Sequence, residues 1–183
     1  VLRDIGLVAI TLLSLKLTPS QVHADNQFSW GPIQEVAKLF AGIFLTIIPV
    51  IAMLKAGVNG PFGSVVAAVT QPDGTPDVVM YFWITGFLSS FLDNAPTYLV
   101  FFNTAGGDAQ VLMTSMASTL AAISAGAVFM GANSYIGNAP NLMVKAIAED
   151  RGIKMPSFFG YMAWSLCILI PLFVIMTFIW FRP

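Results

Sequence analysis

The chain has 183 residues, of which 57% are hydrophobic and only 9% are charged, and its formal net charge is −1. Because a soluble domain carries about 25% charged residues, this composition excludes a soluble protein and predicts an all-α integral membrane protein. A near-neutral chain without a basic cluster argues against nucleic-acid binding, and one cysteine with one histidine excludes an internal disulfide and a Cys/His metal cluster.

The first apolar segment covers residues 2–17 and is barely long enough to span a bilayer, since a spanning helix needs about 20 residues. The sequence opens on Val1 without a basic leader, so we expect it to be a piece of a longer protein. A secretory signal peptide with residues 5–13 as its apolar core is the alternative, which Asp4 and Lys16 fit poorly. After a polar loop, residues 35–54 predict a clear spanning helix with Pro49 inside it.

A charge interrupts the next apolar region, residues 78–104, at Asp93. Pro96 follows closely, and a proline removes a backbone donor and restrains the residue before it, so the helix should break here. The arm after the break is short. Residues 78–104 therefore favour a hairpin that returns to the same side of the membrane over one broken crossing.

Residues 109–144 carry no charge, and residues 111–148 predict a second broken helix, interrupted over residues 131–141 with Pro140 in the break. A last spanning helix is expected over residues 157–181. The loop before it is basic, with Lys145, Arg151 and Lys154, and the positive-inside rule places this loop in the cytoplasm.

A carboxylate at membrane depth costs at least about 2.5 kcal/mol on insertion scales, so Asp93 is a functional candidate. It could bind a cation directly and take a proton in the cation's absence. Neutral oxygens suited to a hard ion come from Asn94, Thr97, Asn138 and Asn141. The alternative is local capping, in which Asp93 or Asn94 only begins the following helix. Helix-to-helix hydrogen bonding is an equal alternative for Ser134 and Asn141, and the isolated Ser89, Ser90 and Asn103 are interpreted as structural.

The motifs Phe91-Leu-Asp-Asn-Ala-Pro-Thr97 and Phe129-Met-Gly-Ala-Asn-Ser-Tyr-Ile-Gly-Asn-Ala-Pro-Asn-Leu142 resemble the C-terminal half of the ion transporter superfamily. This group includes NhaD-type sodium/proton antiporters, arsenite-pump membrane subunits and citrate and dicarboxylate carriers, and the most similar branch is described as sodium/proton antiporters or citrate transporters. The resemblance implies an inverted-repeat half with a re-entrant hairpin and an unwound transmembrane helix, and it places the partner half upstream.

The resemblance also implies the site. The hairpin tip, Ser-Asn-Thr in the carboxylate carriers, corresponds here to Asp93, Asn94 and Ala95, with Thr97 two residues further on. The unwound helix corresponds to residues 133–141 and would contribute Asn133, Ser134, Gly137, Asn138 and Asn141. Sodium or a proton would be the coupling ion, bound at Asp93, and no other cofactor is expected. Family members are homodimers of the bacterial inner membrane.

Asp93 at the tip would repel citrate unless a cation lay between them, and no arginine or lysine is predicted at membrane depth. The sequence therefore ranks sodium/proton antiport above sodium- or proton-coupled citrate uptake, and a non-transporting scaffold subunit is a remote third. An enzyme is not expected, because no histidine lies near a serine or cysteine and no phosphate-binding glycine loop is present.

Overall fold

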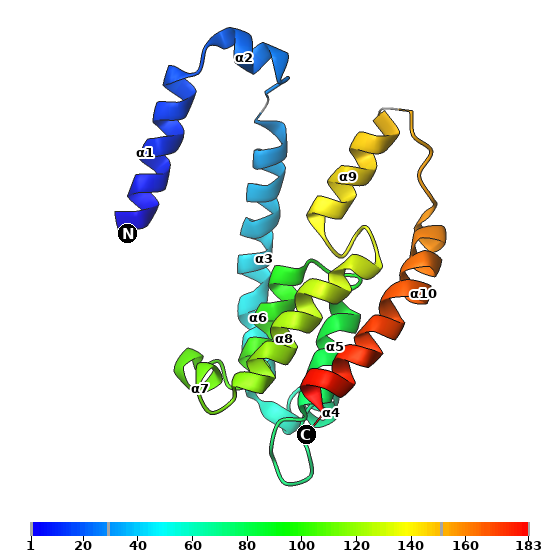
Figure 1. The fold of residues 1–183 in the computed structure, drawn as a ribbon. Coiled ribbons are helices and arrows are strands. Elements are labelled where there is room, and N and C mark those ends of the chain that lie inside the picture. Colours follow the sequence, from blue (N-terminus) through cyan, green and yellow to red (C-terminus); the bar gives the residue numbers. More distant parts are fainter. Residues whose placement is uncertain (1, 29, 151, 183) are drawn as a thin grey trace. The chain divides into compact units, whose positions relative to one another are not determined.

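The computed structural model describes residues 2–28, 30–150 and 152–182 of the chain. These residues are mostly helical, and no β-strand forms among them apart from an isolated bridge between Thr70 and Pro76 (Figure 1). The all-helical class predicted from composition is confirmed for this described part. The chain divides into two units, one up to Gly42 and one from Ile43 onward.

The N-terminal unit holds α1 (Leu2–Leu17), α2 (Ser20–Asp25) and the beginning of α3 (Gly31–Lys55). No residue of α1 is buried, and its leucines, isoleucines and valines are largely exposed. Such an apolar surface suits contact with lipid or another helix rather than water. The connection after α2 is fixed by aromatic contacts, with the ring of Phe28 5.0 Å from His23 and 5.4 Å from Trp30.

The second unit contains the rest of α3 and a series of mostly shorter helices. In chain order these are η1 (Gly57–Asn59), α4 (Gly63–Ala68), α5 (Val78–Ser89), α6 (Asn94–Thr104), α7 (Ala109–Met113), α8 (Ala117–Phe129), η2 (Met130–Asn133), α9 (Ala139–Asp150), α10 (Phe158–Met176) and a π-helical segment η3 (Thr177–Phe181). The segment expected as one helix from residue 111 is thus divided between α7 and α8, with Thr114 outside both. Side-chain caps explain where several of these helices begin: Asp77 accepts from Met80 N at 3.0 Å, and Asp108 accepts from Gln110 N at 2.8 Å.

The connection between α4 and α5 is a tight polar turn. Gly74 adopts a positive φ of 84°, and Thr75 donates both its amide and its hydroxyl to Asp73. These two hydrogen bonds stabilise the ionised form and lower the pKa of the Asp73 carboxyl.

The helices α5 and α6 fold back on each other. Tyr81, in the first turn of α5, meets Phe101, near the end of α6, in an edge-to-face contact with ring centroids 6.3 Å apart. Only an antiparallel pair brings these two ends together, because the chain reverses between Ser89 and Asn94. The pair is therefore a helical hairpin with a short non-helical tip.

α8 packs closely against α5, and two glycines permit this approach. A Cβ added at Gly126 would lie 2.5 Å from the carbonyl oxygen of Phe82, and one added at Gly86 would overlap the side chain of Met130. Small residues at such crossings let two helix backbones come together. The buried core of the unit lies along this contact and includes Phe82, Phe101, Ala122, Ile123 and Met130.

α10 covers the other side of α5. The ring of Phe82 lies 6.3 Å from that of Phe173 and 4.7 Å from that of Phe181. Trp83 donates its indole N–H to the Thr177 hydroxyl at 3.0 Å. Among the described residues, one helix is long and apolar enough to cross a membrane: the 24 residues Phe158–Phe181, with Pro171 inside. The other apolar helices, Val78–Ser89 and Ala117–Asn133, are shorter.

Candidate functional site

Two helix breaks meet in the second unit. The first separates α5 from α6, and the second is the unwound segment between η2 and α9. Ser90, at the end of α5, joins them: Asn133 donates its side-chain N–H to the Ser90 hydroxyl at 3.0 Å, and Ser134 donates its hydroxyl to the Ser90 carbonyl at 2.6 Å. All three residues are buried. The two breaks are therefore joined through Ser90 rather than through Asp93.

Side-chain hydroxyl groups donate hydrogen bonds to the backbone carbonyls around the second break. On the α5 side, Ser89 donates to Ala127 O at 2.5 Å. The Ser90 hydroxyl is shared between Met130 O at 3.0 Å and Gly86 O of its own helix at 2.9 Å. On the α10 side, Tyr161 donates to Ala132 O at 3.3 Å and Ser165 donates to Asn133 O at 2.5 Å. Four backbone carbonyls around the second break are thus satisfied by side chains, as buried backbone groups require.

The unwound segment is shaped by Ser134 and Gly137. The Ser134 hydroxyl accepts from the amides of Ile136 at 3.2 Å and Gly137 at 3.0 Å, which turns the chain back toward α5. A Cβ at Gly137 would lie 2.5 Å from the Ser89 carbonyl oxygen and 2.8 Å from that of Gly131. Only glycine lets the segment pass this close to the end of α5, which gives a physical reason for Gly137 in the motif.

Two buried amide oxygens near the break remain without a partner: Oδ1 of Asn133 and Oδ1 of Asn138. Asn133 is 4% exposed, and its N–H group is already used on Ser90. It also borders a cavity of about 220 Å³ between α5 and α10. Amide oxygens are ligands for hard cations. In the described part of the chain no group of three or more His, Cys, Asp or Glu side chains could hold a metal ion.

The hairpin tip shows the capping arrangement. Asp93 accepts from Ala95 N at 3.1 Å, and its carbonyl accepts from the Thr97 hydroxyl at 3.0 Å. Thr97 is buried, whereas Asp93, Asn94, Ala95 and Pro96 are partly buried. In the described residues no hydrogen bond joins Asp93, Asn94 or Thr97 to the segment 133–141. Asp93 therefore begins α6, and its carboxylate keeps capacity for a further ligand.

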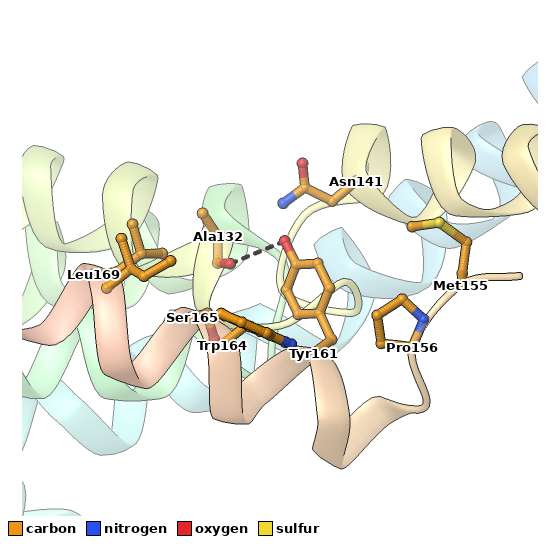
Figure 2. Close-up of a pocket in the computed structure, with 9 residues that line it drawn as sticks. Ala132, Asn141, Met155, Pro156, Tyr161, Trp164, Ser165 and Leu169 are labelled. Carbon is orange, nitrogen blue, oxygen red and sulfur yellow. Dashed lines mark hydrogen bonds between the residues drawn. The ribbon is translucent and has the colours of Figure 1, made fainter.

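Asn141 and Pro140 lie in the first turn of α9, where Pro140 suits the start of a helix. Asn141 borders a cavity of about 490 Å³ between this turn and α10. Figure 2 shows its amide directed toward the Tyr161 hydroxyl, which bonds to Ala132. Asn141 thus lies on a different side of the break from Ser90, and the structure does not gather all predicted site residues around one point.

Within the unwound segment, Tyr135 anchors an aromatic cluster. Its ring centroid lies 5.8 Å from that of Tyr161 and 5.5 Å from that of Phe158. The Lys145 ammonium lies 5.0 Å from the Tyr135 ring centroid and pairs with Glu149 at 2.7 Å. Sequence reasoning assigned Lys145 only to a charged loop, and the structure brings it next to the unwound segment.

Four hydroxyl residues satisfy the broken backbone: Ser89, Ser90, Tyr161 and Ser165. From the sequence, Ser89 and Ser90 are interpreted as structural, whereas Tyr161 and Ser165 are not singled out. Their signal in the sequence is a hydroxyl inside an otherwise apolar helix. Tyr161 and Ser165 are also one helical turn apart on the same helix, so both face the break. Hydroxyls of this kind are common in membrane helices, and their partners are visible only in three dimensions.

Searches of curated proteins and of solved structures gave no match. A family model described as "Putative citrate transport" matches residues 1–181. The match covers nearly the whole sequence, including both helix breaks, and it agrees with the resemblance carried by the two Asn-Ala-Pro motifs. The chain belongs to this citrate-transport family of membrane transport proteins.

Proposed function

We propose that this chain is part of a secondary active transporter that carries a citrate-like carboxylate across the membrane, with sodium as the coupling cation. The cation would bind at the break between η2 and α9. The family description supports the carboxylate, because it names citrate and no exchanged cation. This ranking reverses the order suggested by the sequence motifs.

The observation that carries the proposal is the pair of unpartnered oxygens, Asn133 Oδ1 and Asn138 Oδ1. A buried acceptor without a donor costs about 1–3 kcal/mol, and the four neighbouring carbonyls already have hydroxyl donors. A cation bound at either oxygen would supply the partner that it lacks. Neutral oxygens bind sodium weakly enough to release it, as a coupling ion requires.

The lengths of α5 and α6 favour a re-entrant hairpin. They have 12 and 11 residues, so at about 1.5 Å per residue they reach about 18 Å and about 16 Å, against a hydrocarbon core of about 30 Å. Neither crosses alone, and the tip would lie at membrane depth. Non-helical backbone is tolerated there only when protein or a water-filled cavity surrounds it, and α8 and η2 supply such protein. The resemblance adds an inverted partner half and a homodimer in the bacterial inner membrane.

Sodium/proton antiport is the second candidate, and Asp93 favours it. Its carboxylate is partly buried and accepts a single amide hydrogen bond, from Ala95 N. A group in this position can hold a cation or a proton in turn, which is the chemistry of exchange. In this case the cation would bind at the hairpin tip rather than at the two asparagines.

Reconstitution of the full-length transporter in proteoliposomes separates the two candidates. We expect an inward sodium gradient to drive uptake of labelled citrate, and replacement of sodium by choline to abolish it. Sodium- or lithium-dependent proton release without citrate uptake would establish antiport instead. Absence of both activities in correctly inserted protein would contradict both candidates.

A further inference from the structure

The cavity of about 490 Å³ lies against one continuous face of α10. Tyr161, Trp164, Ser165, Ile168 and Leu169 line it at intervals of three and four residues, and Figure 2 shows most of these side chains on the α10 side of the cavity. The hydroxyls of Tyr161 and Ser165 already donate to η2. The remaining α10 wall is apolar, and Trp164 and Ile168 are 68% and 56% exposed.

One exposed lysine, Lys154, is next in sequence to the end of this cavity near the α9–α10 connection. Met155 and Pro156 form part of its wall, and Lys154 directly precedes them. Lys154 is exposed and makes no ion pair with a described residue. Lys145 lies over Tyr135, whose ring contacts Tyr161 of the cavity wall, although Glu149 partly neutralises it.

We propose that this cavity binds one anionic phospholipid of the cytoplasmic leaflet. The headgroup would lie at Lys154, and an acyl chain would follow the face from Trp164 to Leu169. Residues 161–169 extend about 12 Å along the helix, which matches one leaflet of a core about 30 Å thick. Exposed tryptophan is typical of the membrane interface, and lysines beside a membrane helix attract anionic lipid.

The apolar wall argues against a small carboxylate as the occupant. A carboxylate that leaves water needs several donors, because burying an unpaired charge is costly. The polar side chains that line the cavity are Asn141, Tyr161, Trp164 and Ser165, and the hydroxyls of Tyr161 and Ser165 are already engaged with η2. A lipid would keep its charge outside the cavity, at Lys154, and would need only apolar contact along the face of α10.

Quenching of tryptophan fluorescence by lipids with brominated acyl chains tests this assignment in the full-length transporter. The signal of Trp164 is the difference between the native protein and Trp164→Phe. In nanodiscs of phosphatidylcholine, brominated phosphatidylglycerol should quench this signal at several-fold lower mole fraction than brominated phosphatidylcholine. Lys154→Gln should weaken this preference for phosphatidylglycerol about fivefold, because one lysine near an anionic surface contributes about 1 kcal/mol. Arg182→Gln, beyond the other end of α10, is the matched control and should leave it unchanged.

Equal quenching by the two lipids would overturn the proposal, as would a preference that survives Lys154→Gln. Relief of quenching by citrate at constant lipid would assign the cavity to the substrate instead. Lipid binding does not depend on which ion or carboxylate is transported, so this test stands apart from the proposed function.

Discussion

Replacement of Ser90 by alanine should destabilise the contact between the two helix breaks. The change removes the donor to Met130 O and the acceptor for the Asn133 side-chain N–H, both in a buried site. Hydrogen bonds between membrane helices average about 0.6 kcal/mol and reach about 1.7 kcal/mol, and a buried group left without a partner costs about 1–3 kcal/mol. We therefore expect Ser90→Ala to lower the free energy of unfolding of the full-length transporter by about 1–2 kcal/mol.

Unfolding in mixed detergent micelles measures this effect, with Ser124→Ala as the matched control. The Ser124 hydroxyl donates within its own helix, to Leu120 O at 2.8 Å, so its loss should cost little. A double-mutant cycle between Ser90→Ala and Asn133→Ala should give a coupling of about 0.6–1.7 kcal/mol. The reasoning fails if Ser90→Ala behaves like Ser124→Ala and the coupling is near zero.

Three further substitutions test the packing and the helix breaks. Gly126→Ala should cost about 1–3 kcal/mol in the same unfolding assay, because its Cβ would meet the α5 backbone. Gly6 has open space around it, so Gly6→Ala is the control and should be neutral or stabilising. Equal effects of the two substitutions would refute the close approach of α8 to α5. Asp93→Ser keeps an oxygen that can cap α6 and removes the charge, whereas Asp93→Ala loses the cap at a cost of about 1 kcal/mol in stability. Full transport activity of Asp93→Ser would show that Asp93 serves only as a helix cap. Tyr161→Phe removes the hydroxyl that donates to Ala132 O of η2. It should lower the free energy of unfolding by no more than about 1 kcal/mol, since that hydrogen bond is long at 3.3 Å. A loss of several kcal/mol would mean that the Tyr161 hydroxyl has another role.

The sequence alone was sufficient to predict a helical membrane protein and the positions of its two helix breaks. Low charge and high hydrophobicity predict membrane helices, and the two Asn-Ala-Pro motifs locate the breaks because proline cannot continue a helix that needs its amide. The division of residues 111–129 into α7 and α8 was not predicted. Asp108 explains only where α7 begins, because its carboxylate accepts from the amides of Gln110 and Val111.

The partners at the breaks could not be read from the sequence. Hydrophobic pattern and proline position do not say which carbonyl Ser89, Ser90 or Ser165 will reach, because those bonds link helices 32 to 40 residues apart in the chain. Asp93 was predicted as the main ion-binding residue because a charge in an apolar segment is the most conspicuous feature of the local sequence. The unpartnered oxygen of Asn133 depends instead on what surrounds it, which only the fold determines.

The most direct test of the proposed cation site is the sodium dependence of citrate uptake by the full-length transporter in proteoliposomes. Asn133→Ala and Asn138→Ala each remove one unpartnered oxygen, and each should raise the sodium concentration for half-maximal uptake about tenfold, a loss of about 1.4 kcal/mol. Asn103→Ala is the control, because Asn103 bonds within α6 to Leu99 O. If both variants keep the native sodium dependence, or if citrate affinity alone changes, the cation does not bind at this break.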